Sequence, residues 1–340
     1  MLQVFGDITF KDNNSSDKNW KATLDVFGAY QFDQDNTAIV EIVAEKFSGE
    51  SRLELERWWF KHRFNDSFSA SLGRFHTPIS YWNKKFHHGV NLQDTVDRPF
   101  YLEFEDDNGF LPIHVVGSKF SGDFWTKNST ISYEVFLANN QKIEQEKFVN
   151  GNSDVVVSPQ PTNLFGDKIF TSLGFSVNPH KSPLQFSIYA SEQPITADEL
   201  DYAGLSVVDP TVIFDQRLLS FDVFGRWQTI DLIAEYLRIE TKDLLFNSGT
   251  FESSAAYIQF TYKLNSTGKL ILRTASLDYS DQDPYYQLLS VEEKQRNSIG
   301  YKHNFKGFFD IKLQYSRNKF RDISIRNDNE LLMQVAFFIP

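Results

Sequence analysis

Residues 308–316 read FFDIKLQYS, and their side chains alternate in character along the chain. The apolar residues fall at every second position and are Phe309, Ile311, Leu313 and Tyr315. The polar residues between them are Asp310, Lys312, Gln314 and Ser316. Successive side chains of a β-strand point to opposite faces, so this stretch predicts a strand with one apolar and one polar face. The same alternation recurs at 24–32, 184–191 and 256–264.

Counting the alternating segments gives about sixteen predicted strands over the whole chain. They cover residues 2–10, 20–32, 37–47, 52–64, 67–76, 111–120, 129–138, 168–177, 183–191, 216–226, 229–240, 253–264, 268–278, 293–304, 307–319 and 329–339. The alternation in 52–64 changes faces midway, which predicts a β-bulge in that strand.

The connections between these segments differ in length in a regular way. Every second connection is short and rich in turn-forming residues: 33–36, 64–67, 178–183, 226–229, 265–268 and 304–307, with a longer one at 120–128. The intervening ones are mostly long: 11–19, 77–110, 139–167, 192–215, 241–252, 279–292 and 320–328, with 48–51 as the short exception. If the strands run alternately up and down, all long loops leave one end, which is typical of transmembrane barrels.

Composition excludes several classes of protein. The chain has no cysteine, so it has neither disulfides nor a cysteine-based metal or redox site. Its net charge of −11 argues against nucleic acid as a partner. It contains no apolar run of about 18 residues that would form a membrane-spanning helix. It opens on the strand-like segment LQVFGDITF (2–10) without a signal segment, which favours a processed or engineered mature form.

Aromatic residues are unusually frequent, with 33 Phe, 14 Tyr and 6 Trp. Aromatic side chains near strand ends form girdles at the two surfaces of a membrane, and Tyr30, Phe32, Tyr301 and Phe305 are candidates. Lipid cannot form hydrogen bonds with backbone N–H and C=O groups, so a spanning sheet must close on itself. The sequence therefore predicts an all-β fold: a transmembrane antiparallel up-and-down β-barrel of about 16 strands. We expect one domain over residues 1–340, with a polar, water-filled interior.

The strand number, the sorting of the loops, the acidic composition and the aromatic-rich final segment ELLMQVAFFIP (330–340) together resemble a Gram-negative outer-membrane porin. In that family the last strand ends in phenylalanine, whereas here Phe337 and Phe338 are followed by Ile339 and Pro340. The resemblance implies an outer-membrane location in contact with lipid, and passive diffusion of small hydrophilic solutes or ions. It also implies a homotrimer and no cofactor.

Residues 77–110 form the longest connection, and the resemblance implies that Ser80–Gly109 fold into the lumen and set its constriction. The loop's charged candidates for lining the pore are Lys84, Lys85, His87, His88, Arg98, Glu103, Glu105, Asp106 and Asp107. Its apolar anchors against the wall would be Tyr81, Trp82, Phe86, Phe100 and Phe104. A facing basic set would be Arg57, Lys61 and Arg63, at period-2 spacing, with Arg74. Opposed charges would create a transverse field that selects among solutes. In the simpler interpretation these cations only extend to the membrane surface.

Other functions receive less support from the residues. His76, His87, His88 and His114 lie close in sequence but lack metal-ligand spacing, and the acidic run at 103–109 lacks the spacing of a calcium loop, so no metal is predicted. Nucleophile and phosphate-binding motifs are absent, so we expect no enzyme. Two alternatives remain: a barrel that binds or sheathes a partner protein through 139–167 and 192–215, and, less favoured, an outer-membrane barrel enzyme. A soluble repeat protein would show a repeated motif, and the sequence shows none, so this class is not favoured.

Overall fold

The structure is a computed structural model of the chain. It describes residues 1–13, 18–47, 50–86, 92–103, 109–145, 157–161, 168–197, 200–202, 205–207, 211–305, 307–322, 325 and 327–339. Within these ranges, no helix is both long enough and apolar enough to cross a membrane.

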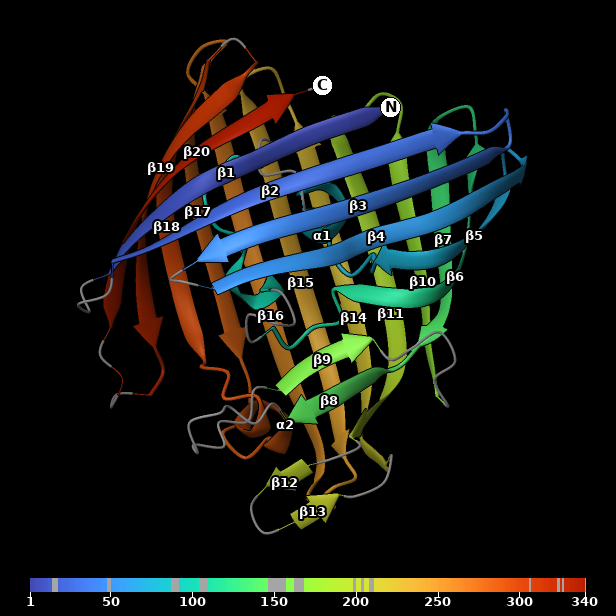
Figure 1. Cartoon of the computed structure of the whole chain (residues 1–340), viewed down its shortest axis with the longest axis vertical. Coiled ribbons are helices and arrows are strands. Elements are labelled where there is room, and N and C mark those ends of the chain that lie inside the picture. The colour runs from blue at the N-terminus through green and yellow to red at the C-terminus, as the bar shows by residue number, and fades with distance from the viewer. Residues whose placement is uncertain are drawn as a thin grey trace.

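Sixteen antiparallel strands form a closed barrel (Figure 1). They are β1 (Leu2–Asn13), β2 (Lys18–Gln31), β3 (Asn36–Phe47), β4 (Glu50–Asn65), β5 (Phe68–His76), β6 (His114–Trp125), β7 (Ser129–Asn139), β10 (Ile169–Pro179), β11 (Leu184–Ala197), β14 (Thr211–Arg226), β15 (Ile230–Asp243), β16 (Gly249–Lys263), β17 (Gly268–Asp278), β18 (Lys294–Phe305), β19 (Phe309–Phe320) and β20 (Asp328–Ile339). Each predicted strand is confirmed, with boundaries that shift by a few residues.

The ring is closed by its first and last strands. β1 pairs with β20 in an antiparallel register that runs from Val4 opposite Ile339 to Asn13 opposite Glu330. This pairing satisfies the backbone groups of both terminal strands, so the barrel wall has no exposed edge at this junction. The predicted antiparallel up-and-down barrel is therefore confirmed.

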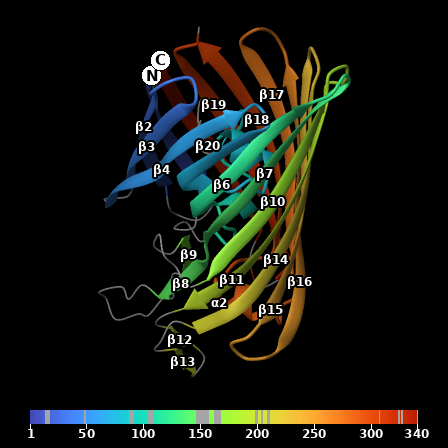
Figure 2. The same ribbon diagram turned by 90° about the vertical axis from the view of Figure 1, so that its right-hand side faces the viewer.

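Shorter elements extend one end of the barrel or lie inside it. These are α1 (Tyr81–Phe86), the 3-10 helix η1 (Phe100–Leu102), α2 (Pro284–Leu288), β8 (Gln141–Gln145), β9 (Val157–Pro161), β12 (Leu200–Tyr202) and β13 (Leu205–Val207). β8 pairs in parallel with β11 and antiparallel with β9, whereas β12 and β13 form a separate ribbon. Both views place β8, β9, β12 and β13 at the end opposite the chain termini (Figures 1 and 2).

The two ends of the barrel carry different connections. Those at the end with the chain termini span residues 32–35, 66–67, 126–128, 180–183, 227–229, 264–267 and 306–308. The opposite end carries the connections at 77–113, 140–168, 198–210 and 279–293, together with shorter ones. We refer to these as the short-turn end and the long-connection end. That the long-connection end faces out of the cell stays a prediction.

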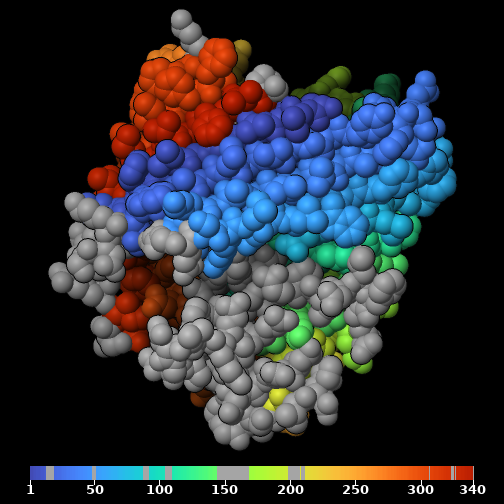
Figure 3. Space-filling model, in the orientation of Figure 1, coloured from blue at the N-terminus to red at the C-terminus, as the bar shows by residue number. Residues whose placement is uncertain are grey.

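The two faces of the wall follow the alternation in the sequence. In β19, Lys312 faces inward with 0% of its surface exposed, whereas Leu313 faces outward with 46% exposed. Aromatic side chains gather on the outer face at the short-turn end, where Tyr30 is 64% and Trp125 71% exposed. Figure 3 shows the outer face of β1–β4 as a continuous band of side chains. An outer face of this kind suits contact with lipid and its interfaces.

The predicted bulge in β4 is confirmed. Glu41 of β3 pairs with Arg57, and the next residue, Ile42, pairs with Leu55, so Glu56 is an extra residue in β4. Glu56 and Arg57 consequently both line the interior, although they are neighbours in sequence. The bulge thus reverses the alternation and keeps both halves of β4 with their apolar residues outward.

Part of the interior is apolar, whereas the sequence predicted a polar lining of the wall. Inward side chains of β14–β17, among them Ile233, Leu237 and Tyr257, form an apolar core with residues of the 77–113 connection and of α2. Water is excluded where chain segments pack inside the ring, so apolar side chains are favoured on that part of the inner face. In β15, the inward face was expected to be polar. It carries the apolar residues Ile233 and Leu237 instead, and both are buried.

β4 and β5 approach each other so closely at Gly73 that a side chain does not fit there. Its φ is +144°, and a Cβ at this position would lie 2.0 Å from the Trp58 carbonyl oxygen. We expect Gly73→Ala to lower the free energy of unfolding by about 2 kcal/mol or more, because an added Cβ forces the strands apart and strains the backbone. Urea unfolding in lipid vesicles, followed by the heat-dependent gel shift of folded barrels, measures this change.

Gly174→Ala is the matched control, since its Cβ would lie 3.5 Å from the nearest atom, Cδ2 of Tyr189, an ordinary contact. We expect its unfolding free energy to change by less than about 1 kcal/mol. Equal effects of the two substitutions would contradict the close approach at Gly73.

Candidate functional site

The 77–113 connection attaches to the inner wall at several points, the first of which is α1. The backbone N–H of Trp82 donates to Oε1 of Glu235 in β15 at 2.7 Å. The ring of Tyr81 stacks on Phe224 of β14, with centroids 4.5 Å apart. Tyr81 and Trp82 are buried, as is Phe100 further along, and Phe86 packs against the same core. All four side chains thus lie in or against the apolar core that the connection shares with the wall, whereas Phe104 lies outside the described residues.

The second attachment is made by charged side chains. Asp94 forms an ion pair of 2.7 Å with Lys269 of β17. Asp97 bridges two strands, because its carboxylate binds Arg273 of β17 and, at 2.8 Å, Arg296 of β18. Both arginine side chains are almost completely buried. Asp97 therefore supplies a carboxylate to two buried cations, of which Arg296 also pairs with Glu330 at 3.3 Å.

Polar backbone atoms of the same stretch are bound by the wall as well. The N–H of Val96 donates to Oε1 of Gln314 in β19 at 3.0 Å. Nζ of Lys302 donates to the Gln93 carbonyl at 3.0 Å. The inner faces of β17–β19 thus supply hydrogen bonds to residues 93–97 of the connection, which form neither a helix nor a strand.

The electrostatic setting of Asp97 reflects these contacts. Burial by itself raises the pKa of a carboxyl group, but the guanidinium groups of Arg273 and Arg296 outweigh it and lower the pKa of Asp97 below its usual value. Asp97 is therefore ionised at neutral pH and holds both arginines.

A second connection, 279–293, packs against the 77–113 connection through α2. The hydroxyl group of Tyr285 in α2 donates to the Phe110 carbonyl at 2.5 Å, and the rings of Phe110 and Tyr286 lie 5.3 Å apart. Asp283 caps α2, since its side chain accepts from the N–H of Tyr285 at 3.0 Å. The 77–113 connection is thus held at α1 by β14 and β15, and at Phe110 by α2.

Charged cavities remain between this packed material and the rest of the wall. One cavity of about 660 Å³ and an adjoining one of about 310 Å³ share Lys61, Lys84, Lys85, Lys119 and Glu134 in their linings. We call these two cavities the basic chamber. Its charged lining consists of Arg57, Lys61, Arg63, Lys84, Lys85 and Lys119 with Asp66, Asp123 and Glu134, so cations predominate.

Glu134 of β7 is the carboxylate at the centre of the basic chamber. It forms ion pairs with Lys119 at 2.7 Å and with Lys84 at 3.1 Å, so it links α1 to the wall. Lys61 of β4 and Lys85 of α1 line the same space. Six cationic side chains against three carboxylates in the lining leave a positive potential in this chamber.

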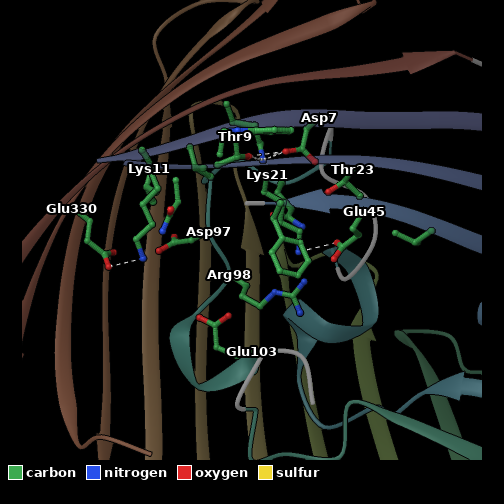
Figure 4. A pocket seen from close by; sticks show the side chains of 18 of the residues that line it. Asp7, Thr9, Lys11, Lys21, Thr23, Glu45, Asp97, Arg98, Glu103 and Glu330 are labelled. Atoms are coloured by element: carbon green, nitrogen blue, oxygen red, sulfur yellow. Dashed lines mark hydrogen bonds and ion pairs between the residues drawn. The ribbon is translucent and has the colours of Figure 1, made fainter. Parts of the chain in front are cut away.

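The other charged cavity, of about 420 Å³, lies between the 77–113 connection and strands β1–β4, β18 and β20 (Figure 4). We call it the acidic chamber. Its acidic lining is Asp7, Asp25, Glu45, Glu56, Asp97, Glu103 and Glu330, and its basic lining is Lys11, Lys21, Arg98 and Arg296. Lys11 pairs with Glu330 at 2.9 Å and Lys21 with Glu45 at 2.8 Å. Carboxylates therefore outnumber cations here.

The sequence predicted that charges of the loop would face opposite charges of the wall. The structure places the predicted pore-lining residues in a different arrangement. Lys84 and Lys85 of the loop share the basic chamber with Arg57, Lys61 and Arg63 of β4. Arg98 and Glu103 line the acidic chamber instead (Figure 4). Like charges therefore gather on each side, because α1 and the 98–103 stretch approach different parts of the wall. The candidates His87, His88, Glu105, Asp106 and Asp107 lie outside the described residues.

Arg74 also differs from the expectation. It does not line the basic chamber, although Ser71, Phe75 and His76 of the same strand do. Its Nε donates to the backbone carbonyl of Glu56 at 2.8 Å. Arg74 therefore completes the hydrogen bonding beside the β4 bulge and does not belong to the predicted cationic face.

The histidines do not form a ligand group in the described part of the chain. The rings of His76 and His114 lie 5.2 Å apart, and Nε2 of His114 is 3.0 Å from Oε2 of Glu56. No set of three or more potential ligands in the described ranges has a metal-binding arrangement.

Sequence reasoning missed Lys119, Glu134 and the Asp97 bridge. Alternation in 111–120 places Lys119 on the same face as Val115, and that signal was sufficient to identify an inward lysine. No such signal exists for Asp97, because its partners are about two hundred residues away in sequence and only the fold brings them together.

The comparisons with known proteins agree with this architecture. Neither a family model nor a curated protein sequence matches the chain. Among solved structures, the chain is similar to an anion-selective porin from Comamonas acidovorans, with 13% identity and a TM-score of 0.64, over 100% of this chain and 99% of the porin.

Two further structures show the same likeness. The outer membrane channel DcaP of Acinetobacter baumannii has 10% identity and a TM-score of 0.61, over 100% of this chain and 96% of DcaP. The trimer form of OmpT, an outer membrane protein of Vibrio cholerae, has 9% identity and a TM-score of 0.58, over 100% and 99% of the two chains. At these identities the likeness establishes the fold, and the predicted resemblance to porins is confirmed at that level.

Asp97→Asn tests the bridge between the loop and the wall. The substitution leaves the buried Arg273 without its carboxylate partner, whereas Arg296 keeps Glu330 at 3.3 Å. We therefore expect the unfolding free energy at neutral pH to fall by about 3 kcal/mol. Urea unfolding in vesicles, followed by tryptophan fluorescence, measures the difference. Because folding lowers the pKa of Asp97, its contribution is complete above the unfolded-state pKa of about 3.9 and is lost as the pH falls below it. The two proteins should therefore converge in acid.

Asp94→Asn is the control on the same stretch. Its partner Lys269 is about one-third exposed, with 32% of its side-chain surface accessible, so solvent screens the pair and we expect a loss below about 1 kcal/mol. A loss for Asp97→Asn that is no larger, or one that persists unchanged in acid, would contradict the bridge.

Proposed function

We propose that this protein is an outer-membrane channel through which small hydrophilic solutes or ions diffuse passively. The observation that carries the proposal is the pair of charged chambers, acidic and basic, left between the 77–113 connection and the barrel wall. Cavities lined by lysine, aspartate and glutamate hold water, and polar solutes enter them at lower cost than apolar ones. The porin fold supports the same function, although the residues of the cavities are specific to this chain.

The 77–113 connection would act as the constriction. It binds β15 through Glu235 and β17–β18 through Asp97, so it occupies the space beside those strands. Solutes would be confined to the part of the interior that borders β18, β20, β1–β7, β10 and β11, where the charged chambers lie. We propose that the whole chain acts as one barrel domain with residues 77–110 as its selective part.

The proposed location is the outer membrane of a Gram-negative bacterium, with lipid around the apolar outer face. The exposed side chains of Tyr30, Phe32 and Trp125 would lie at the membrane surface on the short-turn end. The proposal includes no cofactor, no nucleic acid and no catalysis, and these remain predictions.

Planar-bilayer recording of the refolded protein tests the channel directly. We expect stepwise increases in conductance, because each inserted barrel adds one aqueous path. Heat-modifiable migration on a denaturing gel serves as the control that the sample is folded. A folded sample that leaves the bilayer silent would contradict the proposal and favour a barrel that sheathes a partner.

Selectivity should depend on the basic chamber. We expect the double substitution Lys61→Glu and Lys85→Glu to lower the chloride-to-potassium permeability ratio by about threefold or more, since it reverses charge where the field is focused. Reversal potentials in a salt gradient give this ratio. Lys319→Glu is the control, because Lys319 is exposed on the outer face of β19. An unchanged ratio in the double variant would exclude these lysines from the path.

We also propose that the protein assembles as a homotrimer, as the resemblance to porins implies and as in the trimer form of OmpT. Sedimentation of the protein in detergent, with the bound detergent measured, should give three chains per particle. A particle that contains one chain would contradict this.

A further inference from the structure

The acidic and basic chambers meet at the β4 bulge. Glu56 lines the acidic chamber, and its neighbour Arg57 lines the basic chamber. The extra residue in β4 directs both side chains inward, so the sign of the lining changes within one residue. The bulge therefore marks a boundary between two regions of opposite fixed charge.

The two regions also lie toward different ends of the strands. The acidic chamber includes Lys11, Glu45 and Glu330, which are close to the strand ends that join at the long-connection end. The basic chamber includes Arg63, Asp66 and Gln185, which are close to the short-turn end. A solute that crosses the membrane would thus meet the two regions one after the other.

Pairing within the chambers leaves each with a surplus of its own sign. The acidic chamber is lined by seven carboxylate side chains and four cationic ones, and three of these cations, Lys11, Lys21 and Arg296, form ion pairs with carboxylates of the lining. In the basic chamber Glu134 is shared by Lys84 and Lys119, and the lining still includes Lys61 and Lys85.

Fixed charge of one sign enriches the mobile ions of the opposite sign around it. The range of this effect is the Debye length, about 10 Å at 0.1 M salt and about 3 Å at 1 M salt. At low salt, cations should therefore carry most of the current in the acidic chamber and anions most of it in the basic chamber.

We propose that the pore rectifies: it passes more current at one sign of voltage than at the other. This inference rests on the proposed channel function and adds to it a direction set by charges arranged in series. It assigns the asymmetry to the acidic chamber, the basic chamber and the bulge between them.

The mechanism follows from the two carriers. When the long-connection side is positive, cations move from the acidic chamber toward the bulge and anions move from the basic chamber toward it. Both carriers accumulate at the bulge, and the conductance rises. When the voltage is reversed, both carriers leave the bulge, the region between the chambers is depleted, and the conductance falls.

The test is the current–voltage curve of single channels in symmetric potassium chloride, at equal voltages of either sign. Each channel is analysed separately, because barrels inserted in opposite directions give opposite asymmetry. We expect the two conductances to differ by about 1.5-fold or more at 0.1 M salt, and the ratio to approach one at 1 M, where the charges are screened. A linear curve at low salt would overturn the inference.

Two independent pairs of substitutions identify the source. Lys61→Gln with Lys85→Gln neutralises part of the basic chamber, and Asp7→Asn with Glu103→Gln neutralises part of the acidic chamber. Either pair should bring the conductance ratio toward one, so the test survives if one variant fails to fold. Lys319→Gln on the outer face is the control and should keep the original ratio. Asymmetry that persists in both paired variants would show that the chambers are not its cause.

The outcomes separate the inference from the function on which it rests. A folded protein that gives no conductance steps contradicts both. A protein that conducts with a linear current–voltage curve keeps the channel function and loses only the rectification.

Discussion

The hydrogen-bonded closure between β1 and β20 is the constraint on which the rest of the structure depends. A sheet in lipid must satisfy each backbone group internally, because an unpaired group costs several kcal/mol. Closure removes the edges, and it also fixes an inside and an outside for every strand. The inward row in β19, from Asp310 to Asn318, can then be polar while Leu313 and Tyr315 face outward. In lipid, a closed ring is what allows the apolar positions to face the membrane while the polar positions face the interior.

A ring of this size encloses more space than its own side chains fill. Here the 77–113 connection and α2 occupy part of that space, and they do so with two kinds of contact. Apolar packing against β14–β17 removes water from one part of the interior. Buried charge pairs, of which Asp97 with Arg273 and Arg296 is the best enclosed, fix the position of the loop. A buried carboxylate between two buried guanidinium groups cannot move away without exposing uncompensated charge to a low dielectric. The remaining wet space is therefore well defined.

The fixed charges in that space are segregated by geometry. α1 approaches the wall near β4–β7 and brings Lys84 and Lys85 to a region that is already cationic. The stretch that includes Arg98 and Glu103 approaches β1–β3 and β20, where carboxylates predominate. Glu134 and the ion pairs of Lys11 and Lys21 reduce the repulsion within each region. The bulge at Glu56 brings the two regions into contact, which a regular strand would not do.

The sequence by itself determined the barrel, its strands and the bulge in β4, because period-2 alternation is a local property that each strand carries in its own residues. It also indicated which side chains of β4 face inward, since Arg57, Lys61 and Arg63 share one face. Only the tertiary structure decided that Lys84 and Lys85 join these cations, that Arg74 does not, and that Asp97 binds Arg273 and Arg296. A long connection has no periodicity to fix the direction of its side chains. Its partners are chosen by packing and charge pairing between residues that are far apart in the chain.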